Sequence, residues 1–301
     1  MLGAIIGDIA GSRFEPVLKN RRNRKSKDFI FLSHSKGCEP TDDSIMTLAV
    51  ARAILLHDGT MDDLEEKAIS SMRWLGPKCG NLLRYGPKFR EWLTSPNPQP
   101  YKGTGNGAAM RVSPCGFAAS SLEEAKSLAD AVTKITHNSP EGMKAAEAVS
   151  TAIFLARQGK SIQDIRKYVE NTFHYRFDFT LDGIRRDYKF YVDCEKSVPQ
   201  AFEAFFESTG FEDAIRNAIS IGGDSDTIGT VSISTKVHFR SISNCRKAKR
   251  SVANTFLPQP KPERNAQLQS RQAFWQSFAN NRIVRKLGRL PQGLHGRTHG
   301  T

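Results

Sequence analysis

The chain has 301 residues, with 44 Lys or Arg against 31 Asp or Glu, and a formal net charge of +13. No apolar run is long enough to span a membrane, and Asp8 and Arg13 interrupt the apolar start too early for a signal peptide. The five cysteines have no CxxC spacing, which argues against a disulfide framework or a zinc site. We therefore expect a cytoplasmic protein.

Apolar residues recur at three- and four-residue spacing in several parts of the chain, which predicts amphipathic helices. Many of these segments begin with an acidic or hydroxyl residue, as helices commonly do. Alternation typical of strands is scarce, so the sequence predicts an all-α fold. The predicted helices cover residues 43–56, 121–135, 142–157, 162–171 and 197–207.

A first acidic cluster, Thr41-Asp42-Asp43-Ser44, stands at the start of one predicted helix. Carboxylate and hydroxyl oxygens are hard ligands that suit Mg²⁺ or Mn²⁺. An ordinary helix N-cap with acidic first-turn residues explains the same letters, because the apolar run 45–49 follows directly. The cluster alone does not decide between these interpretations.

The segment Gly105-Asn106-Gly107 lies among several prolines and glycines, which predicts a loop. Backbone N–H groups of such a loop can hold a pyrophosphate, although a plain turn explains the glycines equally well. His137 stands between Thr136 and Asn138, and a lone histidine is more often a structural residue than a site residue.

A second acidic cluster, Gly222 to Thr227, follows much later and contains Asp224 and Asp226. Its glycines allow the backbone to approach a ligand closely. An EF-hand is excluded because Thr235 holds the twelfth position, where that loop needs Glu. If both acidic clusters meet, their carboxylates raise one another's pKa unless cations neutralise them, which favours a two-metal site.

Five short motifs follow one another along the chain, and in content and order they resemble those of the ADP-ribosylglycohydrolases. The similarity covers roughly residues 1–230, and the segment 181–199 is similar to bacterial members in particular. The motifs are Gly3 to Ser12 with Glu15, Thr41 to Asp43, Gly105 to Gly107 with Ala109-Met110-Arg111, Thr136 to Asn138, and Gly222 to Thr227.

The resemblance implies an all-α orthogonal helical bundle with a binuclear Mg²⁺ centre, or Mn²⁺ in its place. The implied reaction cleaves the N- or O-glycosidic bond between ADP-ribose and a protein or small-molecule acceptor. Asp226 would bridge the two ions. The ligands implied are Thr41, Asp42, Asp43 and Asp226 for one ion, and Asp224, Asp226 and Thr227 for the other.

The resemblance also implies roles in catalysis and substrate binding. Glu15 would act beside the metals, together with Asp42 and Asp43, although a surface carboxylate paired with Arg13 or Lys19 is the alternative interpretation. Gly105, Asn106 and Gly107 would lie along the ADP-ribose, with His137 near the nucleotide. The acceptor stays open among arginine, serine, O-acetyl-ADP-ribose and nucleic-acid adducts, because discrimination lies in loop geometry.

The C-terminal part departs from the family. Residues 231–301 hold fourteen basic residues and a single acidic one, Glu263, so the whole net charge lies there. We expect a helical domain over 1–230 and an atypical basic tail over 231–301, partly disordered or produced by a frameshift or fusion. The alternatives are a catalytically impaired member that binds ADP-ribose or has a structural role, and a protein that binds nucleic acid or another polyanion through the tail.

Overall fold

The computed structural model describes residues 1–15, 25–28, 38–78 and 82–236. Within these residues the chain is helical, and its β-structure is an isolated bridge between Gly105 and Asp193. The predicted all-α fold is confirmed. None of the helices found in these segments is apolar over a length that would cross a membrane. The predicted tail lies outside the described residues from 237 onward.

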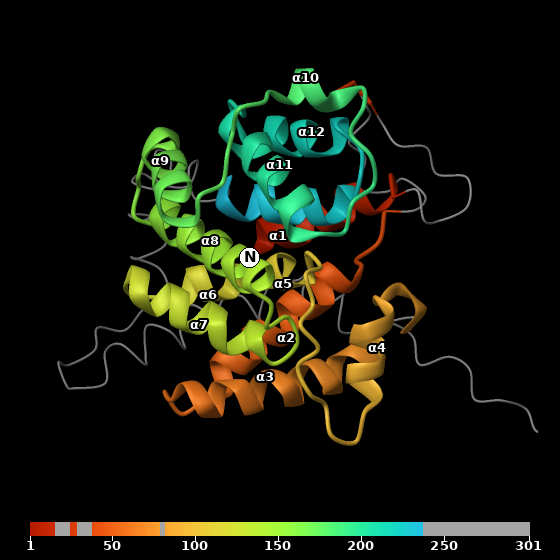
Figure 1. Ribbon diagram of the computed structural model, residues 1–301, viewed down its shortest axis with the longest axis vertical. Helices are drawn as coiled ribbons and strands as arrows, with labels where there is room; N and C mark the ends of the chain where they lie inside the picture. Colours follow the sequence, from red (N-terminus) through yellow and green to blue (C-terminus); the bar gives the residue numbers. More distant parts are fainter. Residues whose placement is uncertain (16–24, 29–37, 79–81, 237–301) are drawn as a thin grey trace, which may run out of the picture. The chain divides into compact units, whose positions relative to one another are not determined.

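The α-helices run as follows along the described chain (Figure 1): α1 (Leu2–Ser12), α2 (Asp42–Leu56), α3 (Met61–Leu75), α4 (Pro87–Thr94), α5 (Gly107–Met110), α6 (Ser113–Ala118), α7 (Leu122–Lys134), α8 (Pro140–Arg157), α9 (Ile162–Phe173), α10 (Leu181–Arg185), α11 (Cys194–Phe206) and α12 (Phe211–Ser220). A further helix covers residues 225–236. The five helices predicted from periodicity correspond to α2, α7, α8, α9 and α11, with ends shifted by a few residues.

Hydroxyl side chains define where several of these helices begin. The side chain of Ser121 accepts a hydrogen bond from the third residue of α7, and Ser139 does the same for α8. Ser161 and Asp164 form a reciprocal capping box at the start of α9. Each cap satisfies backbone N–H groups that have no partner within the helix.

The core gathers around α8, which packs against α5, α6, α7, α9 and α11. On another side, α2 packs against α3 and α6 (Figure 1). The buried face of α8 is rich in alanine and branched apolar residues, including Val149 and Ile153, which are 1% exposed. These small side chains allow neighbouring helices to approach closely on several sides.

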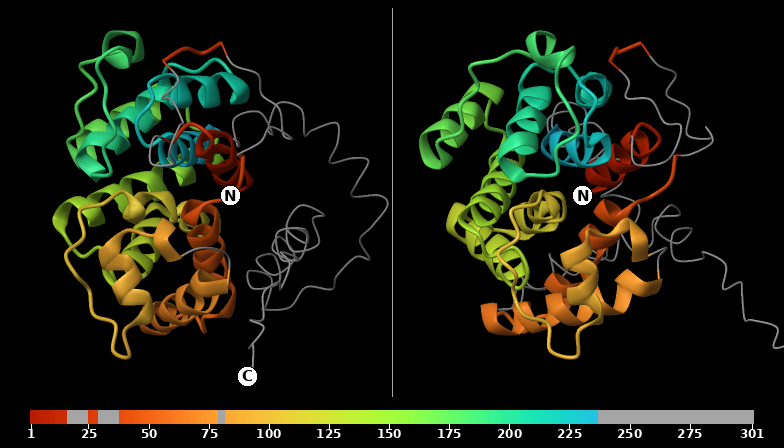
Figure 2. Two further views of the ribbon diagram at one scale, coloured as in Figure 1. Left: turned by 90° about the vertical axis from the view of Figure 1, so that its right-hand side faces the viewer. Right: turned by 45° about the vertical axis from the view of Figure 1, so that its right-hand side comes forward.

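Helix α1 lies directly against helix 225–236, although the two are separated by most of the chain (Figure 2). A Cβ atom added to Gly7 would lie 2.4 Å from the backbone of Gly229, and one added to Gly11 would lie 2.2 Å from Ser225 O. Only glycine permits such an approach of two backbones. Helix 225–236 also continues past residue 230, with Val231 and Ile233 buried.

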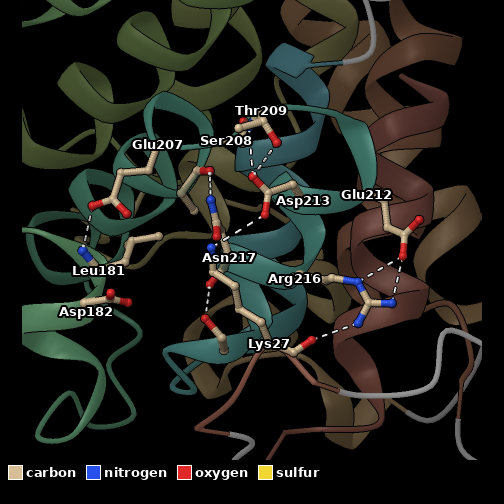
Figure 3. A network of polar contacts seen from close by, with 12 residues as sticks. Lys27, Leu181, Asp182, Glu207, Ser208, Thr209, Glu212, Asp213, Arg216 and Asn217 are labelled. Atoms are coloured by element: carbon tan, nitrogen blue, oxygen red, sulfur yellow. Dashed lines mark hydrogen bonds and ion pairs between the residues drawn. The ribbon is translucent and has the colours of Figure 1, made fainter.

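The short segment 25–28 between α1 and α2 is attached to α12 (Figure 3). Arg216 Nη1 donates a hydrogen bond of 2.8 Å to Lys27 O, and Lys27 Nζ lies 3.5 Å from Asp213 Oδ1. Lys25 Nζ donates to Ile221 O at 2.6 Å, directly before Gly222. These contacts hold segment 25–28 against α12 and against the turn that precedes Asp224.

Candidate metal centre and nucleotide loop

The two acidic clusters of the sequence lie in one site. Thr41 Oγ1 lies 3.2 Å from Asp226 Oδ2, and Thr227 Oγ1 donates to Asp43 Oδ2 at 3.3 Å. The first pair belongs to the starts of two helices, α2 and helix 225–236. The close packing of α1 on helix 225–236 brings these helix starts together, as the two-metal hypothesis requires.

Asp8 of α1 is a buried residue of this site to which the sequence analysis assigned no role. Its Oδ2 accepts hydrogen bonds from the backbone N–H groups of Thr41 at 2.9 Å and Ser44 at 3.0 Å. Its two oxygens also accept from the hydroxyls of Thr41 and Ser44. The signal in the sequence was a single carboxylate in an otherwise apolar segment; the structure shows that it is fully buried, which an acid rarely is without a specific partner.

Thr41 therefore satisfies both interpretations of the first cluster. It is the N-cap of α2, with its side chain accepting from Asp43 N at 3.3 Å. The same hydroxyl faces Asp8 and Asp226. The side chain of Thr41 can thus cap the helix and also face the metal site. The role of Thr41 as a metal ligand stays a prediction.

Glu15 lies just beyond the end of α1 and faces the second acidic cluster. Carboxylate oxygens of Glu15, Asp224 and Asp226 all lie within 4.8 Å of one another. Asp42 lies in the first turn of α2, close enough for the charges of Asp8 and Glu15 to act on it. The carboxylates of both sequence clusters, together with those of α1 and Glu15, form one acidic cluster. Its members are Asp8, Glu15, Asp42, Asp43, Asp224 and Asp226.

Burial and mutual repulsion make ionisation of the acidic cluster unfavourable. Burial, followed by the charge of Asp226, raises the pKa of Glu15 to about 9. Burial raises the pKa of Asp42 and of Asp224 to about 7. Burial and neighbouring carboxylates hold the pKa of Asp43 well above its usual range. Such a site attracts cations strongly.

The donor set fits hard divalent cations. Asp43 Oδ1 is buried and has no hydrogen-bond partner, so the protein leaves one carboxylate oxygen uncompensated at the centre of the cluster. The other available atoms are carboxylate oxygens and the hydroxyls of Thr41 and Thr227, which are the ligand types that Mg²⁺ and Mn²⁺ prefer. The residues present therefore suit the metal that the sequence predicts.

The loop at 105–107 is joined to the acidic cluster by Asn106. Asn106 Nδ2 donates to Asp224 Oδ2 at 2.7 Å. The loop is held on its other flank by the bridge to Asp193 and by Cys194 N, which donates to Thr104 O at 2.9 Å. The predicted loop leads into α5, and it lies beside the acidic cluster as the family resemblance implies.

The protein itself uses some of the backbone N–H groups of this loop. The sequence suggested that its backbone N–H groups hold a pyrophosphate, but Asn106 N already donates to Val192 O at 2.7 Å. The N–H groups of Ala108 and Ala109, the second and third residues of α5, donate to Gly105 O at 3.2 Å and Asn106 O at 2.8 Å. These bonds do not use the N–H groups of Gly105 and Gly107, so the role of the loop in holding a pyrophosphate stays a prediction.

His137 lies against the same loop and is buried. Its Nδ1 is 2.8 Å from Thr136 Oγ1, and its Nε2 is 3.5 Å from the Tyr101 hydroxyl. A Cβ atom added to Gly107 would lie 3.3 Å from Nε2, so the ring edge faces the loop. Burial, aided by the charge of Arg111, holds the pKa of His137 well below its usual range. His137 is thus hydrogen-bonded in the fold and also placed beside the predicted nucleotide loop.

A cleft of about 260 Å³ opens beside the loop. Three of its lining side chains are acidic, and one is basic. The lining residues are Thr104, Glu141, Asp193, Glu195 and Lys196. Asp193 forms the bridge with Gly105, and Thr104 directly precedes Gly105. The cleft therefore adjoins the loop at 105–107.

Comparison with known proteins gives a consistent result. A protein of Archaeoglobus fulgidus described as uncharacterised is 26% identical and matches 77% of this chain and 83% of its own length. A solved ADP-ribosylglycohydrolase-related protein complex contains a chain of similar fold, with a TM-score of 0.58 and 20% identity over 84% of this chain and 93% of that one. The family model described as ADP-ribosylglycohydrolase matches residues 1–232. The chain therefore belongs to the ADP-ribosylglycohydrolase family.

Proposed function

We propose that this protein is a divalent-cation-dependent hydrolase that cleaves the glycosidic bond between ADP-ribose and a protein or small-molecule acceptor. The observation that carries the proposal is the acidic cluster, whose carboxylates come from three distant parts of the chain and meet beside the loop at 105–107. Family membership supports the same reaction class.

Two sets of residues would hold the cations. Thr41, Asp42, Asp43 and Asp226 would hold one, and Asp224, Asp226 and Thr227 the other, with Asp226 shared. The unpartnered Oδ1 of Asp43 supports this assignment, because a buried carboxylate oxygen without a donor favours a bound cation. When bound, Mg²⁺ or Mn²⁺ would orient ribose hydroxyls and lower the pKa of a water molecule.

The side chains would divide the remaining work. Hydrolysis at the anomeric carbon passes through an oxocarbenium-like state, which needs a positioned water and a group that accepts its proton. Glu15 suits proton transfer, since it is half-buried and its carboxylate lies within 4.8 Å of Asp224 and Asp226. Asp42 and Asp43 would position the water, and Asn106 would fix Asp224 through its 2.7 Å hydrogen bond.

The test is calorimetry with Mg²⁺ on the full chain, followed by ADP-ribose titrated into the metal-loaded protein. We expect metal binding, then metal-dependent ADP-ribose binding, and finally release of ADP-ribose from a modified acceptor. The variant Asp224→Ala/Asp226→Ala should lose metal binding, because two converging carboxylates disappear. Asp62→Asn is the matched control, since Asp62 lies exposed in the first turn of α3.

Each failure has a separate meaning. If the folded protein does not bind Mg²⁺ or Mn²⁺, the hydrolase proposal is wrong. If ADP-ribose binds with and without metal but no acceptor is released, the chain is a binding member of the family. Affinity for nucleic acid that falls steeply with salt and survives in the double variant would instead support the basic tail as the functional part.

A further inference from the structure

Arg111 directly follows α5 and is a buried cation whose position requires an explanation. Its side chain is 1% exposed, and among the described residues no carboxylate forms an ion pair with it. The guanidinium lies 5.7 Å from the ring centroid of Phe89, and Nη1 contacts Met72 Sδ at 3.8 Å. Burying a charge without a counter-ion is costly. Its strongest contact is the 2.5 Å hydrogen bond from Nη2 to Thr136 Oγ1.

This hydrogen bond determines where the hydroxyl proton of Thr136 goes. Two acceptors are within reach, His137 Nδ1 at 2.8 Å and Thr133 O at 3.2 Å. Thr133 O already accepts from the backbone N–H groups of Thr136 at 3.0 Å and His137 at 2.9 Å. Donation from a cation polarises the hydroxyl and makes it a better donor. The proton is therefore directed to His137 Nδ1, the closer acceptor.

The consequence is a defined tautomer of His137. A neutral imidazole that accepts at Nδ1 carries its proton on Nε2. The nearby positive charge of Arg111 disfavours a second proton on the ring. Nε2 faces the loop at 105–107. A Cβ atom added to Gly107 would lie 3.3 Å from Nε2, and one added to Gly105 would lie 3.7 Å from it. The side chain that lies near Nε2 is the Tyr101 hydroxyl, whose 3.5 Å distance is long for a hydrogen bond.

We propose that Arg111, acting through Thr136, fixes His137 as a neutral Nε2–H donor that binds an acceptor oxygen of ADP-ribose at the loop 105–107. The inference rests on the proposed function for its ligand. It adds a side-chain donor beside a loop in which the N–H groups of Asn106, Ala108 and Ala109 bond within the protein. Arg111 is thus a positioning residue, while His137 contacts the substrate.

The test reads the tautomer directly, by ¹⁵N NMR of the histidine side chains in the full chain. The His137 signals are assigned by their loss in His137→Gln. We expect Nε2 protonated and Nδ1 unprotonated near neutral pH in the wild-type protein. Thr136→Val keeps the shape but removes the hydroxyl, so it should yield a mixture of tautomers, and Thr136→Ser should restore the single form.

Calorimetry with ADP-ribose on the metal-loaded protein supplies the second readout. Thr136→Val should weaken ADP-ribose binding in proportion to the share of His137 that loses the Nε2–H form, about twofold for an even mixture of tautomers. Thr136→Ser should restore the affinity. Arg111→Lys keeps the charge but not the planar fork, and should give an intermediate tautomer ratio. Unchanged Mg²⁺ binding in each variant would show that the fold is intact.

The outcomes that overturn the proposal are separate from those that overturn the proposed function. A wild-type spectrum with the proton on Nδ1 overturns the role of Arg111, whatever the protein binds. Equal ADP-ribose affinity in Thr136→Val, despite a mixed tautomer, overturns the role of His137 as the donor. Failure of the wild-type protein to bind ADP-ribose, with Mg²⁺ binding and the Nε2–H tautomer present, overturns the proposed ligand but not the tautomer assignment.

Discussion

Two buried polar groupings of opposite charge contact the same loop. The acidic cluster reaches it through Asn106, which donates to Asp224. The Arg111 relay, by which we mean Arg111, Thr136 and His137, reaches it where the ring of His137 lies against Gly107. Each grouping buries charge that nearby protein groups do not fully compensate. Since uncompensated buried charge lowers stability, both groupings are consistent with the ligand-binding roles that we propose for them.

The groupings differ in how the chain assembles them. The acidic cluster needs residues 8–15, 41–44 and 224–227, which meet through the packing of α1 on α2 and on helix 225–236. The Arg111 relay lies within residues 111–137, where α5, α7 and the turn before α8 are close in sequence. A change that separates distant helices should therefore damage the first grouping and spare the second.

The largest effect should come from Gly11→Ala. The new Cβ atom would lie 2.2 Å from Ser225 O and 2.5 Å from the Cα atom of Asp226, so α1 and helix 225–236 must separate. We expect the free energy of unfolding to fall by about 3 kcal/mol, the upper range for an overpacked contact. Mg²⁺ binding should be lost while the His137 tautomer is retained. Chemical denaturation, calorimetry and ¹⁵N NMR measure these three quantities.

Gly86→Ala is the matched control for this glycine variant. No heavy atom lies within 4 Å of the position that its Cβ would take, and its φ of −53° suits alanine. Mg²⁺ binding should stay as in the wild-type protein, and the free energy of unfolding should fall by about 1 kcal/mol at most, because Gly86 is the N-cap of α4, where alanine is less favoured. If Gly11→Ala still binds Mg²⁺ normally, the close contact of the two helices is not what assembles the acidic cluster.

Asp8→Asn should have a smaller effect, confined to the acidic cluster. Asp8 accepts hydrogen bonds from backbone and hydroxyl groups of Thr41 and Ser44, and an amide nitrogen would turn a donor towards one of these donors. We expect a 10- to 100-fold loss in Mg²⁺ affinity, as for other residues that orient metal ligands, and about 2 kcal/mol lower stability. Calorimetry against Asp62→Asn measures the difference. Unchanged Mg²⁺ affinity would show that Asp8 does not orient Thr41.

The sequence predicts much of this architecture because its signals are local. Apolar periodicity identified α2, α7, α8, α9 and α11, and hydroxyl or acidic residues marked several helix starts. The order of the motifs pointed to the family, and the two acidic clusters do meet. Their roles as metal ligands stay a prediction.

Other features depend on tertiary contacts that no local pattern encodes. Asp8 is buried where α1 meets the start of α2, a contact between segments that are more than 30 residues apart. Arg111 belongs to a residue type that is usually exposed, so its burial was not foreseeable. One N–H group of the loop, that of Asn106, donates to Val192 O, which lies far along the chain.

Asp130, an acidic residue outside both groupings, provides the comparison with the smallest expected effect. Asp130 of α7 is half-buried beside Glu147 of α8, and burial followed by this neighbour raises the pKa of Asp130 to about 7. The charges of Lys134 and Lys126 partly offset the repulsion. A pKa raised above its unfolded value of 3.8 contributes stability below pH 3.8 that is lost as the pH rises through about 7.

Asp130→Asn removes that penalty, so the variant should exceed the wild-type protein in unfolding free energy by about 1 kcal/mol at pH 8, after allowance for solvent screening. The gain should shrink towards zero as the pH approaches 4, because the wild-type carboxyl is then protonated. Urea unfolding at several pH values, with and without Mg²⁺, measures it. Since lysines rather than a metal offset the charge here, the gain should be the same with Mg²⁺. A gain that Mg²⁺ abolishes would mean that Asp130 and Glu147 also bind the cation, and the acidic cluster would no longer be distinctive.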